Sequence, residues 1–184
     1  MNKYLVVVDM QNDFVDGTLG TPEAQAIIKN SARKIADFDG SILVTFDTHQ
    51  ENYLETAEGK KLPVKHCIYQ TDGWKLNETI LNQLAGKEVI KVIKNTFGSV
   101  DLPQIINEKN GSEDLSIELI GLCTDICVIS NALILKANFP ESKITVDASC
   151  CAGVTPELHK NALQVMRSCQ IDVINENVTI HTLT

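Results

Sequence analysis

Clusters of basic residues are missing from this sequence of 184 residues, which has 16 Lys and Arg against 24 Asp and Glu and a formal net charge of -8. Binding to a phosphate backbone depends on such clusters, so no nucleic-acid partner is expected. Long apolar runs are missing too: residues 4–8 and 126–137 are short or interrupted by polar side chains. Neither could span a bilayer, so no membrane partner is expected. The N-terminus also lacks the features of a secretory signal, and we expect a cytoplasmic protein.

The C-x-x-C spacing of a zinc ribbon is also absent, although the chain has six cysteines. A metal site made only of cysteines is therefore not expected. With 43% hydrophobic residues, a chain of this length can bury a core without disulfides, so free thiols are the default. No internal repeat, low-complexity tract or linker divides the sequence. We predict a single domain over residues 1–184.

Short Val- and Ile-rich runs alternate with longer amphipathic segments, a pattern typical of a parallel sheet covered by helices. The predicted strands are residues 4–8, 41–46, 89–93, 116–121, 143–146 and 172–174. The predicted helices are residues 22–37, 75–84, 103–108, 125–137 and 156–168, with Thr21 and Thr155 as caps of the first and last. Residues 48–74 are predicted to form a long irregular segment, which in a compact domain is usually functional. The fold class is α/β, in three α/β/α layers around a six-stranded, mainly parallel sheet.

Reactive side chains follow four of the predicted strands. Asp9 follows the first strand, Asp47 and His49 the second, Lys94 the third, and the segment 121–127 the fourth. Open parallel sheets bind ligands at the carboxyl ends of their strands. We therefore expect these side chains at one rim of the sheet.

Cys127 lies in G-L-C-T-D-I-C, where a strand meets the start of a helix. Backbone N–H groups and the helix dipole stabilise a thiolate there and can hold an oxyanion on a substrate. Asp9 is a candidate base and Lys94 a candidate ion-pair partner for it. Taken singly, each has a plain alternative: a buried small cysteine, a turn aspartate and an exposed loop lysine. Asp13 and Asp16 are interpreted as turn residues.

The loop after the second strand holds two carboxylates and two imidazoles: Asp47, His49, Glu58 and His66. This N/O set suits one divalent transition metal, Zn(II), Fe(II) or Mn(II). Ordinary turn chemistry and solvated loop charges are the alternative, and the residues alone leave both open. The other two histidines, His159 and His181, are interpreted as surface residues.

Three motifs occur in order along the chain: V-D-M-Q-N-D-F, V-I-K-N-T-F-G-S and G-L-C-T-D-I-C-V. With them the sequence resembles the isochorismatase-like cysteine hydrolase superfamily and, within it, the nicotinamidase/pyrazinamidase branch, over nearly the whole chain. The resemblance implies an isochorismatase-like, Rossmann-like topology. It also implies a catalytic triad of Asp9, Lys94 and Cys127.

In such a hydrolase, Asp9 takes the thiol proton, Cys127 attacks a carboxamide carbon, and the backbone N–H groups of Cys123 and Cys127 form the oxyanion hole. The resemblance further implies a cis peptide between Leu122 and Cys123.

The resemblance also assigns the metal loop and a ring pocket. The four metal ligands would be Asp47, His49, Glu58 and His66, with zinc the first choice and iron or manganese the alternatives. The metal would hold the pyridine nitrogen of the substrate or lie close to it. The ring pocket would be lined by Phe14, Leu62 and Phe97. The chain departs from the pattern at Leu62, where an aromatic residue would stack more firmly, and in the interval from Glu58 to His66, which is one residue longer than expected.

The resulting prediction is hydrolysis of nicotinamide to nicotinate and ammonia in NAD salvage, with pyrazinamide as a possible second substrate. The alternatives are a metal-free amidase or ureidohydrolase of the same superfamily and a non-catalytic scaffold. The expected partners are a small-molecule amide and further copies of the chain, as a dimer or tetramer. Residues 177–184 are predicted to add an edge strand or to pack on a partner subunit.

Overall fold

In a computed structural model that describes residues 1–176, six parallel strands form one sheet in the order β3-β2-β1-β4-β5-β6. The strands are β1 (Asn2–Val8), β2 (Ser41–Asp47), β3 (Val89–Lys94), β4 (Leu115–Leu122), β5 (Lys143–Ala152) and β6 (Asp172–Ile174). Every predicted strand is present, and the sheet is wholly rather than mainly parallel. Runs of β-branched residues fit this arrangement because strands with helices on both faces are buried on both sides.

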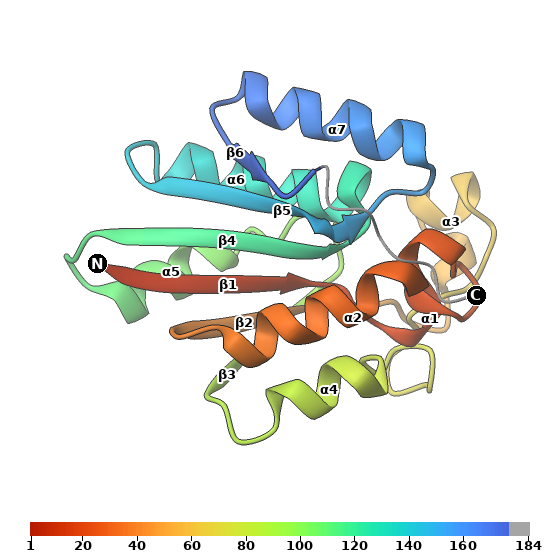
Figure 1. Cartoon of the computed structure of the whole chain (residues 1–184). Coiled ribbons are helices and arrows are strands. Elements are labelled where there is room, and N and C mark those ends of the chain that lie inside the picture. The colour runs from red at the N-terminus through yellow and green to blue at the C-terminus, as the bar shows by residue number, and fades with distance from the viewer. Residues whose placement is uncertain (177–184) are drawn as a thin grey trace.

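Helices cover both faces of the sheet (Figure 1). One face carries α2 (Pro22–Asp37) and α4 (Glu78–Leu84), and the other carries α5 (Leu102–Asn110), α6 (Ile129–Asn138) and α7 (Pro156–Ser168). Successive residues of β1 alternate between the two cores: Val6 packs with α5, α6 and α7, and Val7 packs with α2 and α4. The predicted three-layer α/β/α fold is confirmed.

Both predicted helix caps are present. The Thr21 hydroxyl accepts a hydrogen bond from the N–H of Ala24, and the Thr155 hydroxyl accepts one from Leu158. A proline follows each cap at the first helical position, where its missing N–H costs nothing. These signals fix the starts of α2 and α7.

Several helix predictions were wrong in their bounds. The segment predicted as irregular contains a 3-10 turn, η1 (Tyr53–Glu55), and a short helix, α3 (Ala57–Lys61), which Thr56 caps by accepting from Gly59 N–H. A further short helix, α1 (Asn12–Val15), was not predicted. Elements of three to five residues have too little periodicity to be recognised from sequence. Helix α4 begins at residue 78 rather than 75 because the Asn77 side chain caps it, accepting from the N–H of Thr79.

The predicted helix over residues 125–137 is divided in two. It begins as a π-helical turn, η2 (Thr124–Val128), and continues as α6. Such wide turns are rare and occur frequently at functional sites. Strand β4 ends close to β1 through Gly121, whose φ is 123° and where a Cβ would lie 2.1 Å from the carbonyl oxygen of Val8. Glycine is therefore required at this close approach.

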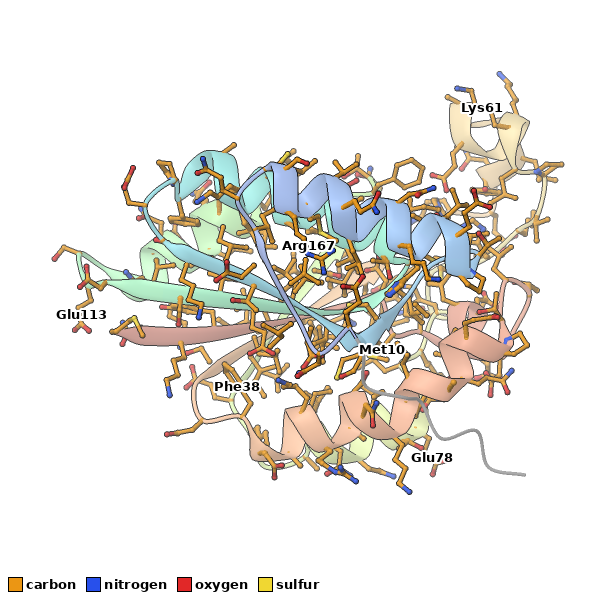
Figure 2. All side chains as sticks on the ribbon, turned by 45° about the horizontal axis from the view of Figure 1, so that its top comes forward. Met10, Phe38, Lys61, Glu78, Glu113 and Arg167 are labelled. Atoms are coloured by element: carbon orange, nitrogen blue, oxygen red, sulfur yellow. The ribbon has the colours of Figure 1, made fainter. Side chains whose placement is uncertain are left out.

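The carboxyl ends of the strands form one edge of the molecule. Figure 2 shows Lys61 of α3 at this edge and Glu113, just before β4, at the opposite edge. The chain order reverses between β1 and β4, which is where ligands bind in open parallel sheets. In the part of the chain that the structure describes, no helix has the length and apolar character needed to cross a membrane. The edge strand predicted over residues 177–184, and His181, lie outside the described residues.

Candidate active site

Three strand ends bring Asp9, Lys94 and Cys127 into contact. Nζ of Lys94 lies 2.6 Å from Oδ2 of Asp9 and 3.6 Å from Sγ of Cys127. All three side chains are buried, with 5% or less of each residue exposed. The predicted triad is therefore assembled in space, although Asp9 follows β1, Lys94 ends β3 and Cys127 lies in η2.

The register of the sheet explains why Asp9 and Lys94 lie side by side. Thr45 of β2 lies beside Val8, and its hydroxyl donates to Oδ1 of Asp9 at 2.7 Å. Lys94 ends β3 directly opposite Asp47, the last residue of β2. Asp9 itself has a φ of 47°, which turns the chain away from the sheet as soon as β1 ends.

Burial sets the protonation of the site. Desolvation raises the pKa of the Asp9 carboxyl, and the charge of Lys94 only partly opposes this effect. Desolvation also raises the pKa of the Cys127 thiol well above its ordinary value, helped by the nearby Asp9 carboxylate. Burial would lower the pKa of Lys94, but the neighbouring carboxylates of Asp9 and Asp47 outweigh this effect and hold the pKa high. Burial therefore favours the neutral thiol of Cys127, next to the charged ammonium group of Lys94.

The turn that carries Cys127 starts at the predicted cis peptide between Leu122 and Cys123, which the structure contains. Cys123 precedes η2, and its carbonyl accepts the N–H groups of Ile126 and Val128. The predicted oxyanion hole, made of the N–H groups of Cys123 and Cys127, lies at this helix start. Its role stays a prediction.

The side chains of Asp47, His49 and His66 converge, with their ligand atoms all within 4.8 Å of one another. Nε2 of His49 is 3.0 Å and Nε2 of His66 is 3.6 Å from Oδ2 of Asp47. Glu58 lies at the margin: its Oε1 is 3.8 Å from both imidazole nitrogens, and its side chain is 24% exposed. Three of the four predicted ligands therefore form a compact, buried cluster able to hold a metal ion, and the fourth faces it.

The hydrogen bonds of the two histidines fit a cation. Nδ1 of His66 lies 2.8 Å from the carbonyl oxygen of Val64, so it must donate, and the lone pair of Nε2 then points into the cluster. Among the described residues, buried Nε2 of His49 has no hydrogen-bond partner, although it lies 3.0 Å from Oδ2 of Asp47. Burial would raise the pKa of Asp47, but the two imidazoles and Lys94 hold it well below its ordinary range. A carboxylate and two imidazole lone pairs suit a divalent transition metal.

A cavity of about 690 Å³ joins the cluster to the thiol. Phe14, Leu62 and Phe97, the predicted ring-pocket residues, all line it, together with Asp47, Glu58, His66, Cys123 and Cys127. Phe14 is buried, whereas 39% of Leu62 and 47% of Phe97 are exposed at the mouth. The predicted pocket residues thus share one cavity with Asp47 and His66 of the candidate metal cluster and with the turn that carries Cys127.

Residues 3–177 match the isochorismatase domain. The chain belongs to the isochorismatase family. Its relatives include the nicotinamidase/pyrazinamidase of Mycobacterium tuberculosis, 25% identical over 92% of this chain and 97% of that protein. Among solved structures, nicotinamidase PncA from Bacillus subtilis is 25% identical with a TM-score of 0.80, covering 95% of this chain and 100% of that one. Pyrazinamidase of Pyrococcus horikoshii, solved in complex with zinc, is 25% identical with a TM-score of 0.74, covering 95% and 99%.

Two buried amides of this isochorismatase-family chain were missed from the sequence. Gln11 fixes the backbone of Asp47, donating from Nε2 to its carbonyl oxygen and accepting its N–H at Oε1, both at 2.8 Å. Asn131 donates to the carbonyl oxygen of Cys127 at 2.8 Å and accepts the N–H of Ser99 at 2.9 Å. Both are fully buried. The sequence marked only Gln11, through its place in the motif V-D-M-Q-N-D-F. Asn131 could not be recognised, because its partners are backbone groups of other segments and such contacts leave no local sequence pattern.

Proposed function

We propose that this protein hydrolyses nicotinamide to nicotinate and ammonia, through a thioester on Cys127. The chain is an amidohydrolase of the isochorismatase family, acting on a carboxamide C–N bond, and its relatives include nicotinamidases. The observation that carries the choice of substrate is the position of Asp47. Its Oδ1 lies 3.5 Å from Nζ of Lys94, while its Oδ2 faces both histidines. A ring held at the metal cluster would therefore present its carboxamide beside Cys127.

The first half of the reaction forms the thioester. Asp9 accepts the proton of the Cys127 thiol, and the sulfur forms a bond to the carboxamide carbon while the carbonyl electrons move onto oxygen. The N–H groups of Cys123 and Cys127 stabilise that oxyanion. The oxyanion collapses, the C–N bond breaks, and the nitrogen takes the proton from Asp9 and leaves as ammonia. Lys94 stabilises the carboxylate and the thiolate through its charge.

The second half returns the free enzyme. Asp9 removes a proton from water, the oxygen adds to the thioester carbon, and the C–S bond breaks on collapse. The thiolate then regains its proton from Asp9, and the carboxylic acid product gives its proton to water and leaves as nicotinate. Asp9 is therefore the group that accepts and returns a proton in both halves of the reaction.

Asp47, His49 and His66 would hold the metal, and Glu58 faces the same position. We propose zinc, which the pyrazinamidase of Pyrococcus horikoshii contains. When bound, the ion supplies a positive charge that attracts a ring nitrogen and so orients the substrate.

The decisive assay measures ammonia release from nicotinamide by the wild type, by Cys127→Ala and by Cys169→Ala. Cys169 directly follows α7 and is not among the residues that line the cavity, so its variant controls for the loss of a thiol. We expect activity in the wild type and in Cys169→Ala, and none in Cys127→Ala. Equal rates in all three would reject the nucleophile, and no release from any would favour another small amide or a scaffold.

A further inference from the structure

The turn that carries Cys127 is attached to the start of α7 by a side-chain hydrogen bond. Thr124, the first residue of η2, is fully buried, and its Oγ1 lies 2.8 Å from Nδ1 of His159. Within residues 1–176 this is the only hydrogen bond of the Thr124 hydroxyl. His159 was interpreted as a surface residue, which was wrong: its ring turns inward to Thr124 and is half-buried.

The position of His159 is fixed by the start of its own helix. The Thr155 hydroxyl accepts from Leu158 N–H at 3.2 Å, and the Thr155 carbonyl oxygen accepts from His159 N–H at 2.9 Å. Pro156 restricts the backbone between them. The imidazole is thus held on a rigid helix of 13 residues rather than on a loop.

A second contact joins η2 to the residues just before α7. Oδ1 of Asp125 accepts the N–H of Val154 at 2.9 Å. At Gly153, an added Cβ would lie 2.7 Å from that Oδ1 and 2.8 Å from the backbone nitrogen of His159. The chain at Gly153 therefore packs against Asp125 and the start of α7 with no room for a side chain. Gly153 and Val154 also line the cavity, so this connection lies in the cavity wall beside the turn that carries Cys127.

We propose that His159 is a positioning residue, whose hydrogen bond to Thr124 fixes the orientation of the nucleophile turn. This inference rests on the proposed function. Thr124 lies between Cys123 and Cys127, so a rotation of the turn about this point would move the oxyanion donors and the sulfur together. The distance from Sγ of Cys127 to Lys94 depends on that orientation.

A neutral ring suits this role. Burial lowers the pKa of His159, and Lys160 on the same helix lowers it further, while Glu176 and Asp125 oppose them. A neutral imidazole can accept the Thr124 hydroxyl at Nδ1 or donate to it, according to its tautomer. An Asn side chain offers the same choice, with its oxygen or its nitrogen near the place of Nδ1.

The test compares matched variants by kcat and KM for nicotinamide. Thr124→Val and His159→Leu keep the volume but remove the hydrogen bond, and we expect kcat to fall roughly 10- to 100-fold with KM unchanged. The double variant should be no worse than either single one, because both remove the same contact. The conservative variants Thr124→Ser and His159→Asn can still form the hydrogen bond and should keep most of the wild-type kcat. Gln164→Ala, exposed on α7, should match the wild type.

A parallel measurement separates this inference from the proposed function. Iodoacetamide alkylates Cys127 without requiring the natural substrate, and its rate at that residue, followed by peptide mass, should fall in Thr124→Val and His159→Leu. Unchanged kcat and unchanged alkylation in those variants would reject the positioning role. Slower alkylation in them, with a wild type that releases no ammonia, would support positioning and reject the substrate.

Discussion

Oδ2 of Asp9 lies 2.6 Å from Nζ of Lys94, in a site where both residues are almost completely removed from solvent. A buried ion pair is costly to break because removing one partner leaves an uncompensated charge. The two members of this pair are not equivalent. Lys94 has a second carboxylate within reach, Oδ1 of Asp47 at 3.5 Å, whereas the other oxygen of Asp9 is bonded to the neutral hydroxyl of Thr45.

This asymmetry predicts the effect of Lys94→Met. Lys94 is the one cation that residues 1–176 place against Asp9. Because the variant leaves this carboxylate unpaired, the free energy of unfolding should fall by about 3–5 kcal/mol. The rate of amide hydrolysis should fall by roughly 10²- to 10³-fold, the range for removing one group that stabilises charge in an active site. Denaturant unfolding and ammonia release measure the two effects. The double variant Asp9→Asn/Lys94→Met should regain stability but no activity, and failure to regain it would contradict the pairing.

The pH dependence of kcat/KM should report Asp9. The carboxylate must be ionised to accept the thiol proton, so activity is present above its pKa and is lost as the pH falls through it. Burial raises that pKa, which places the acid limb above the ordinary aspartate range. Thr45→Val removes a hydrogen bond to the ionised form and should move the limb to higher pH, whereas Thr145→Val, buried on β5, should not. An acid limb that stays in place in Thr45→Val would exclude Asp9 as its origin.

The sheet could be predicted from sequence because a strand buried on both faces leaves a dense run of Val and Ile, as in β1 and β2. Strand ends then located Asp9, Asp47 and Lys94 without knowledge of the register. The length of β5 could not be predicted, because its last residues, S-C-C-A, lack such a run. They are held by pairing with β4 past an irregularity between Leu119 and Gly121.

Contacts between distant segments were the part of the site that sequence could not supply. Asp13 was interpreted as a turn residue, and it does bond the Thr18 N–H. Its other oxygen, however, accepts the N–H of Cys67 at 2.7 Å, which holds the segment that carries His66. The π-helical form of η2 is also invisible to a periodicity argument, since it lasts five residues.

The geometry around Asp47, His49 and His66 predicts which ligands contribute most to metal binding. Protein purified without chelator should contain about one transition ion per chain, and removing the ion should lower the Tm. His49→Ala and His66→Ala should weaken zinc binding more than Glu58→Ala, because the glutamate lies 3.8 Å from both imidazoles and is partly exposed. Elemental analysis and competition with a chromogenic chelator measure both points. A metal content near zero that added zinc does not change would favour a metal-free amidase.

Asp147 predicts how stability depends on pH at a place far from the site. It is 1% exposed and bonds Nζ of Lys34 at 2.9 Å and the Ser149 hydroxyl at 2.7 Å. Burial would raise its pKa, but these partners hold it below the unfolded value of about 3.9. Its contribution is therefore present above that value and lost as the pH falls through the lower, folded pKa. Asp147→Asn should cost about 1.5–3 kcal/mol at pH 7, and this difference from the wild type should shrink below pH 4. A constant difference across that range would contradict the assignment.

Leu62 predicts how the cavity selects its substrate. It follows α3 at the mouth, with 39% of its surface exposed, and lines the same cavity as Phe14 and Phe97. A leucine contacts an aromatic ring through a small area, whereas a tryptophan could stack on it and add about 0.5–1.5 kcal/mol. Leu62→Trp should therefore lower KM for nicotinamide by roughly 2- to 10-fold at unchanged kcat. Steady-state kinetics with an aliphatic amide of similar size supply the control, because stacking cannot improve its binding. An equal fall in KM for both amides would show that the new side chain only narrows the cavity. That result would contradict the assignment of Leu62 to the ring pocket.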